Sequence, residues 1–306
     1  MFMDKRHRTY LFLFALITCF YTACAGDQKS PEIHIVYSGS INGALDDCRC
    51  GGPVVGGMTR MLTVIDSLRK QYPNMILLDA GDFLNSYSIP GANKVMLRLL
   101  SLARYNALNL GDQEFVEGRD FIFSENRTAQ LKLPFISANL QDESSRDLLS
   151  LLVKTMNISG VKVDIIGLTT PASFEFIHPQ KLVANAVDSV LTGLKNKYHF
   201  DSGIQIILFH GDAGQAAALI QKFPWIDVVI MAHEQKQQFF QKNNTAVAET
   251  GGDGEYIGHL IVRRNGNSLI FKNDFIPILE DLPVNSLSKK IVDDYFQSIR
   301  QKSGVE

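Results

Sequence analysis

The feature that most constrains this chain is an alternation of strand and helix patterns that gives way to a strand-only tail. Short apolar runs typical of buried strands recur through residues 32–230, and apolar side chains at helical spacing separate several of them. Three successive strand patterns at 245–275 have no helix between them, and one helix follows at 286–300. This order predicts an α/β protein with two packed mixed β-sheets flanked by helices and an antiparallel tail.

The expected strands are the apolar runs at residues 32–37, 75–78, 107–110, 134–138, 161–168, 204–209, 226–230, 245–249, 256–263 and 268–275. The expected helices cover residues 58–68, 95–103, 184–197 and 286–300. No internal repeat or long linker interrupts this series, so we expect residues 32–306 to form a single domain.

Composition excludes one class of partner. The chain has 306 residues, 45% of them hydrophobic, which is enough to bury a large core. Its formal net charge is −2, and its longest basic run is Lys5-Arg6-His7-Arg8. A nucleic-acid partner is therefore not expected, because such surfaces carry basic patches.

The N-terminus has the pattern of a bacterial-type secretory signal. The basic run precedes apolar residues 10–21 and a zone of small residues, and this apolar run is too short to span a bilayer. Residues 1–24 are therefore predicted to be a signal peptide of the lipoprotein type, with Cys24 as the lipidation candidate and 25–31 as a polar tether. An ordinary cleavage site at Ala23-Cys24-Ala25 remains the alternative. The expected location is the bacterial periplasm or cell envelope, with the membrane contacted through an N-terminal lipid.

Polar side chains with metal-ligating atoms follow four of the expected strands. Asp82 and Asp112 follow two early strands, and His210 and His233 end two later ones. Because functional sites form at the carboxyl ends of strands in α/β sheets, these side chains are expected to converge. Oxygen and nitrogen ligands of this kind suit Zn²⁺, Mn²⁺ or Fe²⁺. The alternative is that each Asp caps a turn and each His is an ordinary core or surface residue.

Segments in the same order make the chain resemble a known family. They are residues 77–83, 106–115, 134–139, 160–171, 226–233 and 251–258, within a similarity that spans roughly residues 32 to 275. The chain resembles the N-terminal catalytic domain of the 5′-nucleotidase branch of the calcineurin-like metallophosphoesterases. The resemblance implies a four-layer sandwich of two sheets and two helix layers, and a metal-dependent phosphoester hydrolase.

The departures from the family pattern fall on one of its two metal positions. Ser40 and Asn42 stand where the family has an Asp and a His, and Gln235 stands where it has its last His. The resemblance thus implies that this metal position has lost three of its four ligands and keeps only the bridging Asp82. The other position keeps four competent ligands, which implies one divalent transition metal held by Asp82, Asp112, His210 and His233.

Two further departures concern the chemistry. Gln113 replaces the family's catalytic His, and Asp112 replaces an Asn ligand. An added carboxylate makes the metal a weaker Lewis acid, and the loss of a general acid costs about 10²–10⁴-fold in rate. The expected activity on a small phosphorylated molecule is therefore impaired or altered.

The loop Cys48-Arg49-Cys50 suggests a second function. It resembles a subgroup with a C-x-C loop at this place, some members of which carry selenocysteine there. The resemblance implies thiol redox chemistry or soft-metal binding by Cys48 and Cys50, whereas a structural role for the pair is the alternative. The other functions left open are thus a non-hydrolytic thiol-redox or metal-binding lipoprotein with a redox partner, and a binding scaffold without chemistry.

Overall fold

The structure, a computed structural model, describes residues 31–47, 52–200 and 202–303. Residues Glu32–Glu306 form one compact unit. The expected signal peptide (1–24), most of the tether (25–31), Cys24, Cys48 and Cys50 lie outside the described residues, so these remain predictions.

No helix in the described part of the chain is both long enough and apolar enough to cross a bilayer.

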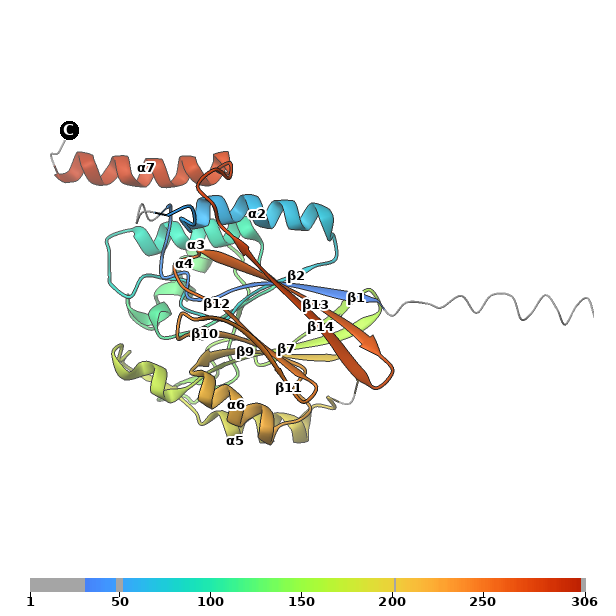
Figure 1. The fold of residues 1–306 in the computed structure, drawn as a ribbon. Helices are drawn as coiled ribbons and strands as arrows, with labels where there is room; N and C mark the ends of the chain where they lie inside the picture. Colours follow the sequence, from blue (N-terminus) through green and yellow to red (C-terminus); the bar gives the residue numbers. More distant parts are fainter. Residues whose placement is uncertain (1–30, 48–51, 201, 304–306) are drawn as a thin grey trace, which may run out of the picture. The chain divides into compact units, whose positions relative to one another are not determined.

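Two six-stranded sheets form the centre of the compact unit (Figure 1). The first has the order β14-β13-β1-β2-β3-β4, with strands Ser268–Pro277, Tyr256–Asn265, Glu32–Ser38, Ile76–Asp79, Ala107–Asn109 and Phe135–Ile136. The second has the order β11-β12-β10-β9-β7-β6, with strands Gln237–Lys242, Thr245–Thr250, Val228–His233, Ile204–Gly211, Val161–Thr169 and Lys154–Ile158. A small pair, β5 and β8, joins Leu140–Asp142 to Leu182–Ala184.

Both large sheets are mixed, with a parallel centre. Strands β1 to β4 run parallel, and β13 joins them antiparallel to β1. Strands β7, β9, β10 and β12 also run parallel, while β6 and β11 pair antiparallel at the edges. Parallel strands bring their carboxyl ends to one edge of a sheet, where sites form.

Helices cover the outer face of each sheet (Figure 1). Those on the first sheet are α2 (Met58–Gln71), α3 (Ala92–Ala103) and α4 (Phe121–Thr128), and α7 (Ser286–Ser303) packs outside α2 and α3. Those on the second are α5 (Val187–Lys197) and α6 (Ala213–Lys222). Two short 3₁₀ turns, η1 (Gln113–Phe115) and η2 (Pro171–Glu175), follow β3 and β7.

Side-chain alternation along the strands divides the core into three layers. Ile206 and Leu208 of β9 join the core between the two sheets, whereas Ile207 and Phe209 join the core under α5 and α6. The period of two in a strand sends successive side chains to opposite faces, so both faces of the parallel strands must be apolar. Two mixed sheets with helices outside each confirm the predicted fold class.

Several details differ from the sequence predictions, and strands β5, β6, β8 and β11 and helix α4 were not expected. The tail is not wholly antiparallel, because β12 pairs parallel to β10. Ala184 ends strand β8 instead of beginning a helix. Helix α6 was not expected, because its run of alanines gives little contrast between an apolar and a polar face, although Asp212 forms a capping box with Gln215 at its start.

Candidate metal centre

The four predicted ligands lie at the carboxyl ends of strands from both sheets. Asp82 follows β2 and Asp112 follows β3 in the first sheet. His210 is the next-to-last residue of β9, and His233 is the last residue of β10 in the second sheet. In the register of these two strands, His210 pairs with Ala232, so the two histidines lie within one residue of the same level.

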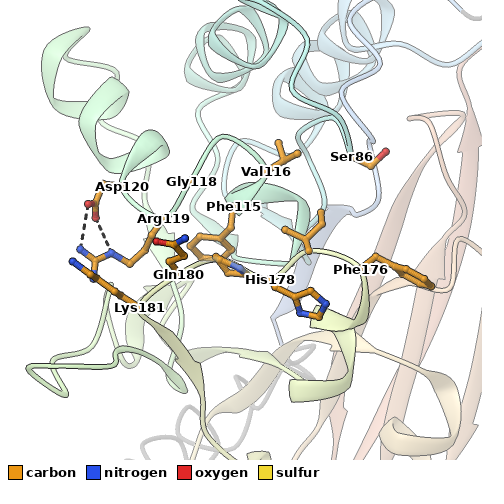
Figure 2. A pocket seen from close by; sticks show the side chains of 12 residues that line it. Ser86, Phe115, Val116, Gly118, Arg119, Asp120, Phe176, His178, Gln180 and Lys181 are labelled. Atoms are coloured by element: carbon orange, nitrogen blue, oxygen red, sulfur yellow. Dashed lines mark hydrogen bonds and ion pairs between the residues drawn. The ribbon is translucent and has the colours of Figure 1, made fainter.

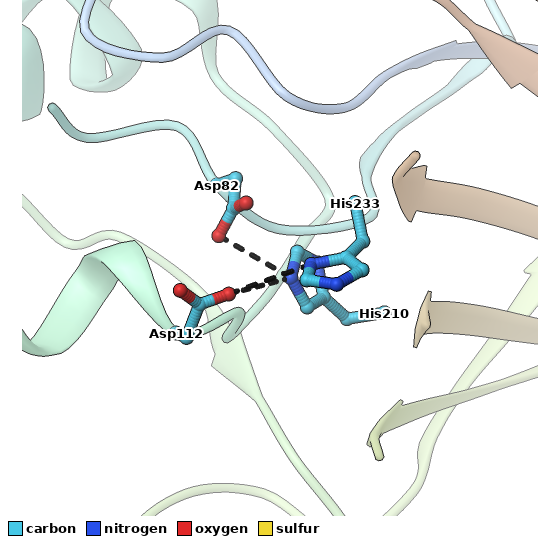
Figure 3. A group of neighbouring side chains, drawn as sticks. All are labelled: Asp82, Asp112, His210 and His233. Carbon is cyan, nitrogen blue, oxygen red and sulfur yellow. Dashed lines mark hydrogen bonds and ion pairs between the residues drawn. The ribbon is translucent and has the colours of Figure 1, made fainter. Parts of the chain in front are cut away.

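The structure brings these four side chains together (Figure 3). One ligand atom from each of Asp82, Asp112, His210 and His233 lies within 4.8 Å of the others. Nε2 of His210 is 3.0 Å from Oδ1 of Asp112 and 3.3 Å from Oδ1 of Asp82, and Nδ1 of His233 is 3.6 Å from Oδ1 of Asp112. The predicted convergence is therefore a geometric fact, whereas the metal-binding role stays a prediction.

Burial makes it unfavourable for both carboxylates to be charged at once. Asp82 is 2% exposed and Asp112 is 7% exposed. Burial raises the pKa of Asp82 well above its ordinary range, and the neighbouring charge of Asp112 raises it further. Burial also acts to raise the pKa of Asp112, but hydrogen bonds and charge from His210 and His233 outweigh it and hold that pKa below its ordinary value. A cation between the carboxylates would relieve this repulsion.

The donor set fits a divalent transition metal. Two carboxylate oxygens and two imidazole nitrogens are the ligands that Zn²⁺, Mn²⁺ and Fe²⁺ accept. His210 is fully buried, while the side chain of His233 is 36% exposed, so the cluster opens to solvent on one side only. An open side is what a catalytic site needs in order to admit water and substrate.

Glu114 holds the loops that carry the two aspartates. Its carboxylate accepts hydrogen bonds from the backbone N–H groups of Asp82, Phe83, Leu84 and Gly111 at 2.6–3.2 Å. Burial raises the pKa of Glu114 to about 8, and the charge of Asp82 adds to that rise. Sequence patterns assigned Glu114 no role, although an acidic residue two positions after a predicted ligand was a usable signal.

The three substituted positions lie beside the cluster, in left-handed backbone conformations. The φ angles of Ser40, Asn42 and Gln235 are 49°, 54° and 57°. The Ser40 hydroxyl accepts a hydrogen bond of 3.0 Å from the backbone N–H of His233, whose own φ is 106°. Such a φ is rare for a non-glycine residue and must be held by its surroundings. Ser40, at one of the substituted positions, therefore helps to hold the backbone of the predicted ligand His233.

Asn42 and Gln113 are neutral side chains that form hydrogen bonds on the same side of the cluster. The Asn42 amide donates to Oδ1 of Asp253 at 2.8 Å and accepts from the Gln113 side-chain amide at 3.2 Å. The Gln113 backbone N–H donates to Oδ1 of Asp82. A Gln amide has no titratable proton near neutral pH, so the predicted catalytic position offers hydrogen bonds but no general acid.

A cavity of about 420 Å³ opens over the cluster. It is lined by Asp82, Ser86, Tyr87, Asp112, Gln113, Phe176, Ile177, His233 and Gln235. None of these described lining residues is Lys or Arg. Two carboxylates without a cationic side chain repel a phosphate ester, so a bound cation is what would make this cavity suitable for one.

Several curated 5′-nucleotidases are similar to the chain, although no protein-family profile matches it. The chain is 25% identical over 310 residues to a snake venom 5′-nucleotidase from Naja atra, covering 87% of this chain and 55% of that protein. The 5′-nucleotidase of Vibrio vulnificus is 23% identical over 285 residues, covering 78% of this chain and 49% of that protein. The chain thus spans about half the length of these curated relatives.

Solved structures show the same fold. A 5′-nucleotidase precursor from Thermus thermophilus has a TM-score of 0.75 at 19% identity, covering 89% of this chain and 59% of that one. The calcineurin-like phosphoesterase YfkN from Bacillus subtilis has a TM-score of 0.70 at 18% identity, covering 88% of this chain and 98% of that one. The chain therefore shares the fold of the calcineurin-like phosphoesterases. Its curated homologues are 5′-nucleotidases, which confirms the predicted relationship to the 5′-nucleotidase branch.

Proposed function

We propose that this chain is an exported, metal-dependent phosphoric ester hydrolase with one metal held by Asp82, Asp112, His210 and His233. The observation that carries the proposal is the approach of these four ligand atoms to within 4.8 Å, at the floor of an open cavity. The expected metal is Zn²⁺, Mn²⁺ or Fe²⁺, and the expected substrate is a small phosphorylated molecule. The 5′-nucleotidase homologues support the reaction class.

A bound metal of this kind polarises a phosphoryl oxygen and lowers the pKa of water. The protein's own contribution is to fix the ligands: Glu114 anchors the Asp82 loop, and Ser40 holds the backbone of His233. Gln113 orients Asn42 through its amide but supplies no proton to a leaving group. Turnover should therefore be slow with poor leaving groups, which need protonation, and faster with good ones.

The expected location and membrane attachment also remain part of the proposal. They depend on the N-terminal pattern at residues 1–24 and on Cys24. Mass spectrometry of the mature N-terminus tests both: a diacylglyceryl cysteine at Cys24 supports the lipid anchor, and an unmodified N-terminus beyond it contradicts the anchor but not export.

The central experiment measures metal content and phosphatase activity on the same protein. Purified wild-type protein loaded in turn with Mn²⁺, Zn²⁺ and Fe²⁺ should hold about one metal per chain and should hydrolyse 4-nitrophenyl phosphate, a substrate with a good leaving group. His233→Ala should hold less metal and lose activity. His34→Ala is the matched control, because His34 lies near the start of β1, away from the carboxyl ends. A wild-type protein that binds no metal under any loading contradicts the proposal.

The thiol-redox alternative concerns Cys48 and Cys50, which the structure does not describe. It keeps its own test, thiol trapping at controlled potentials: a pair that cycles between dithiol and disulfide supports it, and a pair that never cycles removes it.

A further inference from the structure

Two aromatic side chains are largely exposed to water, although burial of apolar surface is favourable. Phe176 is 86% exposed and Tyr87 is 75% exposed, the highest values among large hydrophobic side chains of the described residues. Both line the cavity that contains Asp82, Asp112 and His233. Single exposed apolar residues are ordinary, but two aromatic rings at the rim of one concave polar site indicate ligand contact.

The turn that carries Phe176 is tied to one of the predicted metal ligands. Thr170, just before η2, donates its backbone N–H to the carbonyl of His210 at 2.9 Å, and the Ser173 hydroxyl donates to the same carbonyl at 3.3 Å. The two hydroxyls of Thr170 and Ser173 are also 2.9 Å apart. The position of Phe176 is therefore set relative to His210 and not by a free loop.

Phe174 fixes the other side of the same turn. Its ring packs against the buried ring of Phe115 at a centroid distance of 6.0 Å, and Phe115 ends the η1 turn that begins one residue after Asp112. Phe174 is partly buried against the core, whereas Phe176 two residues later is exposed (Figure 2). The turn is thus held from both sheets, and it presents one ring to solvent at the cavity.

Tyr87 lies on the loop between β2 and α3, which is also anchored on both sides. The Asn85 backbone N–H donates to the Asn93 side chain at 3.0 Å, and the Ser88 hydroxyl donates to Glu117 at 2.9 Å. Neither anchor buries Tyr87 itself. A loop held in this way loses less conformational entropy when its ring contacts a ligand.

A second pocket continues from the cavity past Phe176. Its volume is about 650 Å³, and it shares Ser86, Phe176 and Ile177 with the cavity over the cluster. Arg119, His178 and Lys181 lie along it (Figure 2), although Arg119 is already paired with Asp120 and Asp142. The combined space is larger than a phosphate group needs and has room for an attached organic group.

We propose that Phe176 and Tyr87 form a ring-binding subsite for a phosphate ester that carries a planar aromatic group. The ring stacks on these side chains while the phosphate faces the four-residue cluster. Only the phosphate end rests on the function proposed above. Stacking on an aromatic face is tolerant of the ring's substituents, so the subsite selects for a planar ring and not for one hydrogen-bonding pattern.

The test compares two non-hydrolysable ligands, phenylphosphonate and methylphosphonate, by calorimetry on full-length protein loaded with Mn²⁺. Wild-type protein should bind phenylphosphonate about tenfold more tightly, the factor that stacking of one ring typically gives. The double variant Phe176→Ala/Tyr87→Ala should reduce that preference to twofold or less with methylphosphonate affinity unchanged. Phe176→Tyr keeps a ring and should keep the preference.

Phe296→Ala on α7 is the matched control, because Phe296 is an exposed aromatic ring outside both pockets. Equal affinity for the two phosphonates in the wild type, or a preference that survives in the double variant, would overturn the subsite and leave the metal centre standing. Failure of both phosphonates to bind would overturn both proposals. Because both substituted side chains are mostly exposed, the variants are expected to fold.

Discussion

The kept and the substituted positions of the site differ most in how their polar groups are satisfied. At the four kept positions, charged or ionisable atoms face one another at 3.0–3.6 Å and burial raises the pKa of Asp82. At the substituted positions, neutral groups pair with partners inside the protein: Ser40 with His233, and Asn42 with Asp253 and Gln113.

This difference indicates which side of the site has the charge to attract a cation. Buried like charges are unfavourable until a cation or a proton joins them, whereas neutral side chains such as those of Ser40 and Asn42 carry no charge that must be balanced. The substituted side is therefore part of the scaffold for the kept side. Variants on the two sides should consequently behave differently, and the following measurements test that expectation.

The largest expected difference is between His210→Ala and Asn42→Ala. Removing the buried imidazole should lower bound metal below about a tenth per chain and lower kcat/KM for 4-nitrophenyl phosphate by about 10³-fold, because a metal supplies several kcal/mol to phosphoryl transfer. Asn42→Ala should keep the metal and most of the rate. Elemental analysis and steady-state kinetics measure both, and equal losses in the two variants would contradict the division into two sides.

The next effect is a gain on the substituted side. Gln113→His places an imidazole where the chain has an amide, and we expect kcat for poor leaving groups to rise by about 10²-fold, since general acid catalysis contributes this much or more. The gain should fall away as pH rises above about 6.5, where an unperturbed His loses its proton. The pH–rate profile of the variant measures this. If kcat does not rise, or if the rise does not fall off above about pH 6.5, the absence of a general acid at position 113 does not limit the rate.

Metal removal should lower thermal stability by an intermediate amount. Ligand binding to the folded state contributes about 3 kcal/mol when the free metal exceeds its Kd by about a hundredfold. For a chain of this size, chelation should then lower Tm by roughly 5 °C. Asn42→Ala should show the same shift and Asp112→Ala almost none. Scanning calorimetry with and without chelator measures this, and a shift retained in Asp112→Ala would place the metal elsewhere.

The smallest effect concerns the anchor of the kept side. Glu114→Gln keeps one acceptor oxygen but turns an amide N–H₂ toward backbone N–H groups, which should lower the free energy of unfolding by about 2 kcal/mol. Glu125→Gln is the control, since its pair with Lys94 is exposed and should contribute less than about 1 kcal/mol. Denaturant melts of both variants give the comparison, and similar small losses would mean that Glu114 is not an anchor.

The sequence by itself determined the fold class and which four side chains come together. Apolar runs marked the strands, and Asp82, Asp112, His210 and His233 were recognisable because each lies where such a run ends. That local information is sufficient because parallel strands bring their carboxyl ends together whatever lies between them. The order of segments fixed the relationship to metallophosphoesterases in the same way.

Only the tertiary structure decided the contacts between distant residues. The link between Asn42 and Asp253 joins positions 211 residues apart, and the parallel pairing of β12 with β10 depends on which neighbour the strand meets. The exposure of Phe176 beside the cluster is also decided by tertiary structure. From the sequence a phenylalanine is expected in the core, and only the packing of the elements leaves this one exposed. Periodicity reports which face of an element is apolar, but not what that face or its loops will touch, since those contacts arise when separate elements pack.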